Sequence, residues 1–104
     1  MAQFRLTRRA EADVVSIGAY TLRTWGEDQT VRYLEDLEAS CQMVADNPAL
    51  GRVCDAVHPG LLRMESGQHV VFYRQAAGGI LISRILHQRM LPERHAINGE
   101  DEEE

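Results

Sequence analysis

Lysine is absent from this sequence, and long apolar runs are absent with it. All 11 basic residues are arginines, and arginine stays protonated, so it cannot act as a general base. No apolar run approaches the roughly 20 residues that span a bilayer, and the first nine residues lack the apolar stretch of a signal peptide. These absences predict a cytoplasmic protein that does not associate with a membrane.

Metal and cofactor motifs are missing as well. Cys41 and Cys54 form no Cys-x-x-Cys motif, and a reducing compartment would keep both as thiols. The four histidines have no paired-ligand spacing, and no glycine-rich loop precedes a helix where it could hold a phosphate. We therefore expect no metal and no cofactor, with Cys41 buried as a small hydrophobe on a helical stripe.

The net charge of −5 is unevenly distributed. Five of the 16 acids form the terminal run 100–104, and the remaining 11 balance the 11 arginines. Residues 52–95 hold six arginines and three acids, which favours an anionic or acidic partner for this half. We expect one domain over residues 1–98 and an acidic, disordered tail over 99–104, which either stays solvated or folds back on the basic half.

Two helices are predicted after a short strand at residues 3–6. Thr7 offers an N-cap, and apolar residues then recur at helical spacing as far as Gly26, which can adopt the left-handed conformation that ends a helix. A second helix begins near residue 27 and ends at Asn47-Pro48, because proline removes a backbone donor. The short connection predicts an antiparallel helical hairpin.

Beyond Gly51 the apolar period changes to that of β-strands. Segments 61–65, 69–74 and 80–86 are rich in β-branched and aromatic residues, and glycine-containing turns separate them. Pro92 could open a short helix over 93–97. The predicted fold is α+β: an antiparallel sheet of about four strands, in the order β-α-α-β-β-β with a short C-terminal helix, packed on an α-helical hairpin.

Strand alternation divides the last predicted strand between the two faces of the sheet. It places Ser83, Ile85 and His87 on one face and Ile80, Ile82, Arg84 and Leu86 on the other. If one face receives the helices, the opposite face can present cations in a shallow concavity. Alternatively, each arginine only covers the sheet with its aliphatic stem.

The candidate target-binding residues are the cations on or beside the strands, with two polar neighbours. They are Arg63, Arg74, Arg84, His87, Gln88, Arg89 and Arg94. RNA cleavage would need a proton acceptor and a proton donor, which His69 or His87 could supply with help from Tyr73. Because the histidines are scattered in the sequence, we assign no catalytic residue.

Several segments together resemble ParE-like toxins of the RelE/ParE superfamily, over roughly residues 3 to 97. They are Leu6–Val14, Tyr20–Gly26, Tyr33-Leu34, Asn47–Arg52, Pro59–Arg63, His69–Arg74, Ile85–Met90 and Pro92–His95. The resemblance implies a small antiparallel sheet that carries a helical hairpin, the fold that the sequence pattern also predicts.

The resemblance also implies partners. A type II toxin is neutralised by a cognate ParD-like antitoxin whose extended or helical segment wraps the apolar grooves of the toxin. We expect a hetero-oligomer with this antitoxin, and contact with DNA only indirectly through it. The residues expected to meet the antitoxin are Trp25, Tyr33, Leu37 and Tyr73.

Three activities remain open within the superfamily. ParE-like members poison DNA gyrase, whereas RelE-like members cleave messenger RNA on the ribosome through a basic, lysine-containing site. The absence of lysine and the His-Gln-Arg-Met ending at 87–90 favour the gyrase toxin, which is not itself an enzyme. Leu91 stands where many ParE-like chains carry aspartate, and the acidic run at 100–104 is unlike the family. The alternatives are a metal-free ribonuclease and an inactive homologue that acts only in a repressor complex with its antitoxin.

Overall fold

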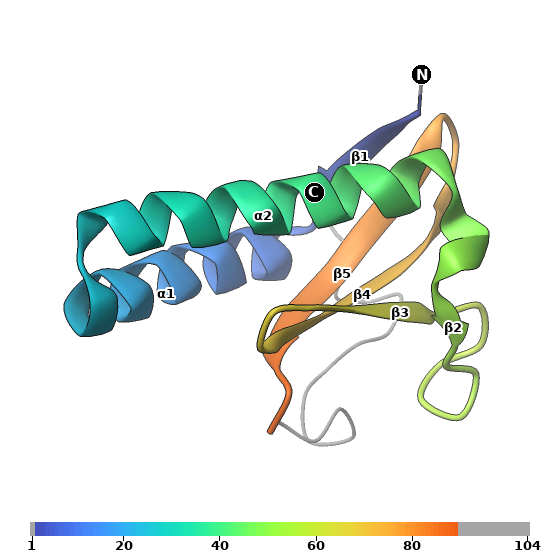
Figure 1. Ribbon diagram of the computed structural model, residues 1–104. Helices are drawn as coiled ribbons and strands as arrows, with labels where there is room; N and C mark the ends of the chain where they lie inside the picture. The colour runs from blue at the N-terminus through green and yellow to red at the C-terminus, as the bar shows by residue number, and fades with distance from the viewer. Residues whose placement is uncertain (1, 90–104) are drawn as a thin grey trace.

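The structure is a computed structural model that describes residues 2–89. The chain forms β1 (Gln3–Leu6), α1 (Arg8–Trp25), α2 (Glu27–Asp46), the 3-10 helix η1 (Pro48–Leu50), β2 (Arg52–Val53), β3 (Leu62–Ser66), β4 (His69–Ala76) and β5 (Gly79–His87) (Figure 1). The α+β fold and the order of its elements are confirmed, with β2 as an additional short strand. The helix predicted over 93–97 and the tail over 99–104 lie outside the described residues.

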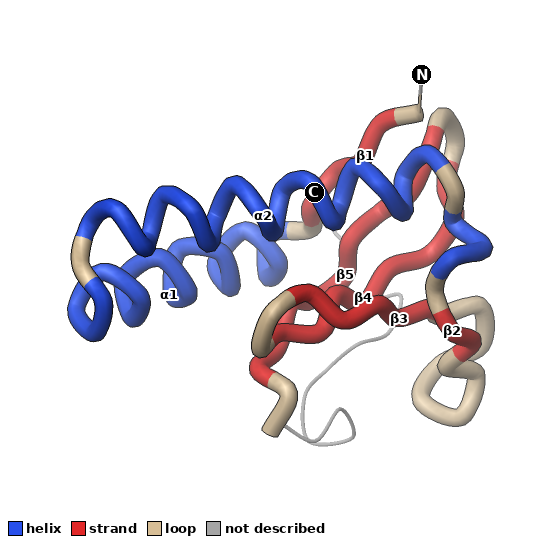
Figure 2. The backbone as a smooth tube through the Cα atoms, viewed as in Figure 1, coloured by secondary structure: helices blue, strands red, loops and turns tan. Residues whose placement is uncertain are grey.

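The two helices begin and end where local chemistry predicts. The Thr7 hydroxyl accepts a hydrogen bond from the Ala10 N–H at 3.0 Å and donates to the Ser83 carbonyl at 2.9 Å, so one side chain caps α1 and joins it to β5. Gly26, with φ of 88°, ends α1 and immediately precedes α2. The two helices therefore lie side by side as a hairpin on one side of the sheet (Figures 1 and 2).

The sheet has five strands in the order β1-β5-β4-β3-β2. Strands β2 to β5 run antiparallel to one another, as expected for a sheet of about four strands, but the additional pairing of β1 with β5 is parallel, so the sheet is mixed and not antiparallel throughout. The parallel pair is made by strands far apart in sequence. No hairpin turn joins them, and tertiary packing therefore sets their direction.

The main core lies between the helical hairpin and one face of the sheet. Val71, Tyr73 and Ile82 from the sheet meet Leu37 and Cys41 from α2, all nearly inaccessible to solvent. Burial, with a smaller contribution from the nearby Glu38 charge, raises the pKa of the Cys41 thiol to about 12. Cys41 is thus a buried hydrophobe that stays protonated at neutral pH, in agreement with its place on the predicted apolar stripe.

A β-bulge changes the alternation along β5. Tyr73 pairs with Ile82 and Phe72 pairs with Arg84, so Ser83 is the additional residue. The bulge places Ile85 in the same core cluster as Ile82, whereas Leu86 joins Phe72 in a second small cluster on the opposite face. The predicted grouping of Arg84 with Ile80 and Ile82 was therefore wrong, because strict alternation does not continue through a bulge.

None of the helices within residues 2–89 combines the length and the apolar character needed to cross a membrane. The same residues contain no group of three or more histidine, cysteine, aspartate or glutamate side chains arranged to hold a metal ion.

Candidate functional site

A largely apolar hollow in the surface lies beside the second half of α1. Two adjoining pockets, of about 290 and 210 Å³, share Tyr20, His69 and His87 in their walls. Trp25 lines the second pocket and is 67% exposed, and Tyr20 is 57% exposed. We call this pair of pockets the α1 groove; its remaining walls include Asp13, Ile17, Gln29, Tyr33, Gln68 and Ile85.

A tyrosine and two histidines in the wall of the α1 groove contact one another. The Tyr33 hydroxyl lies 2.5 Å from His69 Nδ1 and accepts the Gln68 N–H at 3.0 Å. The rings of His69 and His87 meet edge to face, with centroids 5.4 Å apart. Gly67 makes this close arrangement possible, because a Cβ there would approach the Tyr33 ring to 2.8 Å.

Hydrogen bonds hold both histidines through Nδ1. The Tyr33 hydroxyl lies within hydrogen-bond distance of both His69 Nδ1 and the Ser66 carbonyl, the latter at 3.4 Å. His87 Nδ1 accepts the Arg89 N–H at 3.2 Å. Burial, followed by the charge of neighbouring His87, lowers the pKa of His69. In both rings Nε2 takes no part in these hydrogen bonds and can form one with a ligand in the groove.

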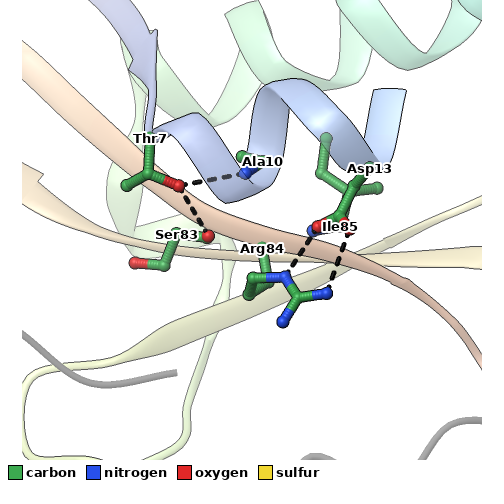
Figure 3. A network of polar contacts seen from close by, with 6 residues as sticks. All are labelled: Thr7, Ala10, Asp13, Ser83, Arg84 and Ile85. Carbon is green, nitrogen blue, oxygen red and sulfur yellow. Dashed lines mark hydrogen bonds and ion pairs between the residues drawn. The ribbon is translucent and has the colours of Figure 1, made fainter. Parts of the chain in front are cut away.

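One end of the α1 groove is held by a partly buried ion pair (Figure 3). Asp13 on α1 accepts hydrogen bonds from Arg84 Nε at 2.8 Å, from an Arg84 terminal nitrogen at 3.0 Å and from the Ile85 N–H at 2.9 Å. The side chains of Asp13 and Arg84 are only 14% and 13% exposed. Arg84, predicted as a target-binding cation, thus has a structural partner that fastens α1 to β5.

Arginines gather on the sheet face that points away from the helices. Arg52 pairs with Arg63 across β2 and β3, and Arg63 pairs with Phe72 of the opposite-face cluster. Arg74 and Arg5 are both register partners of Leu81, between the core residues Ile80 and Ile82. Residues that pair directly share a face. We call Arg5, Arg52, Arg63 and Arg74 the arginine face.

The predicted antitoxin-contact residues fall into two environments. Trp25 and Tyr33 come together in the wall of the α1 groove. Leu37 and Tyr73, in contrast, are 4% and 0% exposed, and the Tyr73 hydroxyl donates to the Pro48 carbonyl at 2.7 Å. Their apolar character reflects a role in the core, so neither side chain offers a surface to a partner in this structure.

The predicted target-binding residues are likewise divided. Arg63 and Arg74 lie on the arginine face, whereas His87 lies in the wall of the α1 groove. Gln88 and Arg89 follow β5 and are exposed. Arg94 lies outside the described residues.

Sequence reasoning missed several residues of these surfaces. Arg5 and Arg52 join the arginine face only through strand register, which alternation within one strand does not reveal. Tyr20, which follows Ile17 by one helical turn, could have been recognised as an exposed aromatic flanking the buried stripe of α1. The contact between His69 and Tyr33 joins positions 36 residues apart and has no local signal.

Comparisons with known proteins point to one family. Residues 4–92 match the family described as the ParE toxin of the type II toxin-antitoxin system, parDE. Toxin ParE1 of Caulobacter vibrioides is 39% identical over 95 residues, covering 91% of this chain and 98% of the relative. Toxin ParE1 of Mycobacterium tuberculosis is 37% identical over 90 residues, covering 86% and 92% of the two chains.

A solved structure agrees on the fold. A chain from the structure titled "Chromosomal ParDE TA system from P. aeruginosa" has a TM-score of 0.71, covering 84% of this chain and 96% of the other. At 19% sequence identity, the similarity concerns the fold alone.

Proposed function

This chain belongs to the ParE toxin family of type II toxin–antitoxin systems, and from this premise we propose that it inhibits DNA gyrase by protein–protein binding and is neutralised by a ParD-like antitoxin. The proposal requires no covalent chemistry by the toxin and no cofactor. The antitoxin as a partner follows from the family, whereas the gyrase target and the two binding surfaces are our inference.

The observation that carries the proposal is the separation of two chemically different surfaces. The α1 groove is largely apolar and lies on the helical side of the sheet, and the arginine face lies on the other side. A toxin that is silenced by one protein and acts on another can use two such surfaces. We assign the groove to the antitoxin and the arginine face, with Arg89, to the target.

The α1 groove suits the antitoxin because of its exposed aromatic rings. Trp25 and Tyr20 are more than half exposed, and large exposed aromatics often contribute most of the binding energy in protein interfaces. His69 and His87 can form hydrogen bonds with backbone carbonyls or acidic side chains of the bound segment. An apolar helix or extended segment that carries one such acceptor could therefore pack on the aromatic rings and form a hydrogen bond with the histidines.

The assignment of the antitoxin is tested by replacing Trp25 with alanine. Loss of a central aromatic anchor should weaken binding of the cognate antitoxin by about 30-fold, the equivalent of roughly 2 kcal/mol. Val53→Ala is the matched control, since Val53 is 70% exposed on β2, on another part of the molecule. Equal affinities for the two variants in calorimetric titrations would exclude the groove as the antitoxin site.

The assignment of the target is tested by the triple substitution Arg63→Gln, Arg74→Gln and Arg89→Gln. It should relieve inhibition of gyrase supercoiling, whereas Arg32→Gln on the exposed side of α2 should inhibit like the unaltered chain. Circular dichroism confirms that each variant is folded. Undiminished inhibition by the triple variant would exclude the arginine face as the target surface.

A second candidate, ribosome-dependent RNA cleavage, is favoured by one observation. His69 and His87 lie in contact in the α1 groove, and Tyr33 orients the first of them, so an acid and a base are present together. Tyr73, the tyrosine expected to assist, is buried and bonded to Pro48. Cleavage of messenger RNA on purified ribosomes that is lost in His87→Gln would support this candidate against gyrase inhibition.

A further inference from the structure

A row of three aromatic rings lines the α1 groove. His69 on β4 and His87 on β5 are register partners, and their rings meet edge to face with centroids 5.4 Å apart. Tyr33 of α2 meets the His69 ring in the same way, at 5.5 Å. All three residues are partly exposed and line the second pocket of the groove. A ligand in the groove therefore covers two rings of the kind that takes up protons near neutral pH.

The helices bring little charge to the two histidines. Asp13 and Tyr20 line the groove from α1, and Tyr33 lines it from α2. The Asp13 carboxylate already accepts two hydrogen bonds from the Arg84 guanidinium and one from the Ile85 N–H. Among the described residues of the groove wall, Asp13 carries the one formal charge, and Arg84 balances it. The helical side thus offers little stabilisation to two positive imidazolium rings.

The strand side does not supply the missing negative charge. Ser66 on β3 is the register partner of His69 and is neutral. Arg89 follows β5 and is exposed, and its positive charge disfavours a further cation nearby. Burial and the charge of His87 together lower the pKa of His69 and outweigh the charge of Asp13, which raises it.

The hydrogen bond at His87 exists only while this ring is neutral. His87 Nδ1 accepts the Arg89 N–H at 3.2 Å. A protonated imidazole carries a proton on both nitrogens and cannot accept a hydrogen bond, so protonation of His87 breaks this contact. The neighbouring hydrogen bond from the Gln88 N–H to the Gln68 carbonyl, at 2.9 Å, does not involve the ring. Protonation of His87 is therefore felt directly at Arg89.

His69 can be protonated without losing a hydrogen bond. Its Nδ1 lies within hydrogen-bond distance of the Tyr33 hydroxyl, which can donate to the ring or accept from it. When the ring carries the proton, the hydroxyl can donate to the Ser66 carbonyl at 3.4 Å instead. The two histidines therefore respond differently to acid, and His87 is the one that couples the groove to the residues after β5.

An apolar ligand favours the neutral state of both rings. Trp25 and Tyr20 are more than half exposed in the wall of the groove that the histidines share. A segment packed on these two aromatic rings also removes water from His69 and His87. Loss of water penalises the charged form of an imidazole. Binding of such a segment therefore releases protons that the two rings carry.

We propose that the His69–His87 pair makes binding in the α1 groove sensitive to acid. An apolar segment of the antitoxin binds to the neutral pair, and protonation of the pair weakens this binding and breaks the hydrogen bond from Arg89. The identity of the partner rests on the proposed function, whereas the coupling between His87 and Arg89 does not.

The first test is calorimetric titration of the full chain with its purified cognate antitoxin at pH 5.5 and pH 7.5, in two buffers of different ionisation enthalpy. A histidine of ordinary pKa, about 6.5, that must become neutral on binding weakens a complex about tenfold over this range. We expect a loss of this order, together with release of protons. The double variant His69→Gln/His87→Gln should lose both effects. His58→Gln, in the loop between β2 and β3 and outside the groove, is the matched control and should keep them.

Two calorimetric results would overturn the proposal. One is equal proton release by the unaltered chain and the double variant. The other is an affinity that rises at pH 5.5, the result expected if a carboxylate of the partner lies against the histidines.

An NMR titration of the free chain provides the second measurement. The amide signal of Arg89 should move with the titration of the His87 ring between pH 8 and pH 5, because the hydrogen bond is lost with the first proton on Nδ1. This movement should be absent in His87→Gln and unchanged in His58→Gln. An Arg89 amide signal that stays fixed while the His87 ring titrates would exclude the coupling.

This inference and the proposed function fail separately. If Trp25→Ala leaves the affinity for the antitoxin unchanged, the antitoxin does not occupy the groove, and the NMR titration alone decides whether His87 is coupled to Arg89. If Trp25→Ala weakens binding but the affinity of the unaltered chain does not depend on pH, the groove assignment stands and the acid sensitivity is wrong.

Discussion

Replacing Asp13 with alanine removes three hydrogen bonds from the junction between α1 and β5. Two of them come from the Arg84 guanidinium and one from the Ile85 N–H, all between 2.8 and 3.0 Å. Removing one partner of a buried ion pair costs about 3–5 kcal/mol, because the other charge remains desolvated. With 13–14% of each side chain exposed, water can solvate Arg84 in part, so we expect the lower limit, about 3 kcal/mol.

Urea unfolding followed by circular dichroism measures this loss. The control is Glu35→Ala on α2, an exposed position where the free energy of unfolding should change by less than about 0.5 kcal/mol. The double variant Asp13→Ala/Arg84→Ala should be less destabilised than the sum of the single variants by at least about 1 kcal/mol. A loss below about 1 kcal/mol in Asp13→Ala, or strict additivity in the double variant, would show that the Asp13–Arg84 ion pair does not stabilise the junction between α1 and β5.

Two further predictions concern the sheet and the histidines. Gly79→Ala should destabilise the fold by about 3 kcal/mol in the same urea assay, because the added methyl group would overlap the Gln3 carbonyl and disrupt the pairing of β1 with β5; a change under about 0.5 kcal/mol would contradict this contact. The pKa of His69 is lowered by burial and by His87, so the unfolded chain takes up a proton at higher pH than the folded chain. Stability should therefore fall as the pH drops below about 6.5, and His87→Gln, which removes a neighbouring charge that lowers this pKa, should make the fall smaller; identical pH profiles for the two proteins would exclude the charge of His87 as a cause.

The helical half of the fold could be predicted because its signals are local. Thr7, Gly26 and Pro48 each act on the backbone within a few residues of themselves, and the observed helices begin and end at these positions. The three long strands were also expected within one or two residues of their observed bounds. Their glycine-containing turns, too, are encoded locally.

The bulge at Ser83 could not be predicted, and it determines much of the site. If the register of the Ala76–Gly79 pair continued along β4 and β5 without a bulge, His69 would pair with Leu86. Because of the bulge, His69 pairs with His87 instead. Uninterrupted alternation would also turn Arg84 toward the helices and Ile85 away from them. The bulge is thus favoured by the burial of Ile85, a consequence of tertiary packing that no short sequence motif reveals.

The sequence predicted the chemical character of the candidate surfaces but not all of their residues. An arginine-rich sheet face was expected, and Arg63 and Arg74 lie there, but Arg52 and Arg5 join it through pairing between strands. Of the apolar residues proposed for the antitoxin, composition could not distinguish exposed Trp25 from buried Tyr73. Helical spacing identifies which apolar residues lie on the same face of a helix. The packing of the two helices on the sheet determines which of these residues remain exposed to solvent.

We propose that this chain acts on gyrase through non-covalent binding. The most direct test of this proposal is the incubation of purified gyrase and relaxed plasmid DNA with the chain, alone and with its antitoxin, followed by gel analysis of supercoiled and linear DNA. We expect loss of supercoiling and accumulation of cleaved DNA with the toxin alone, and recovery of supercoiling when the antitoxin is added. Normal supercoiling at toxin concentrations that arrest growth, together with cut messenger RNA on purified ribosomes, would contradict the proposal.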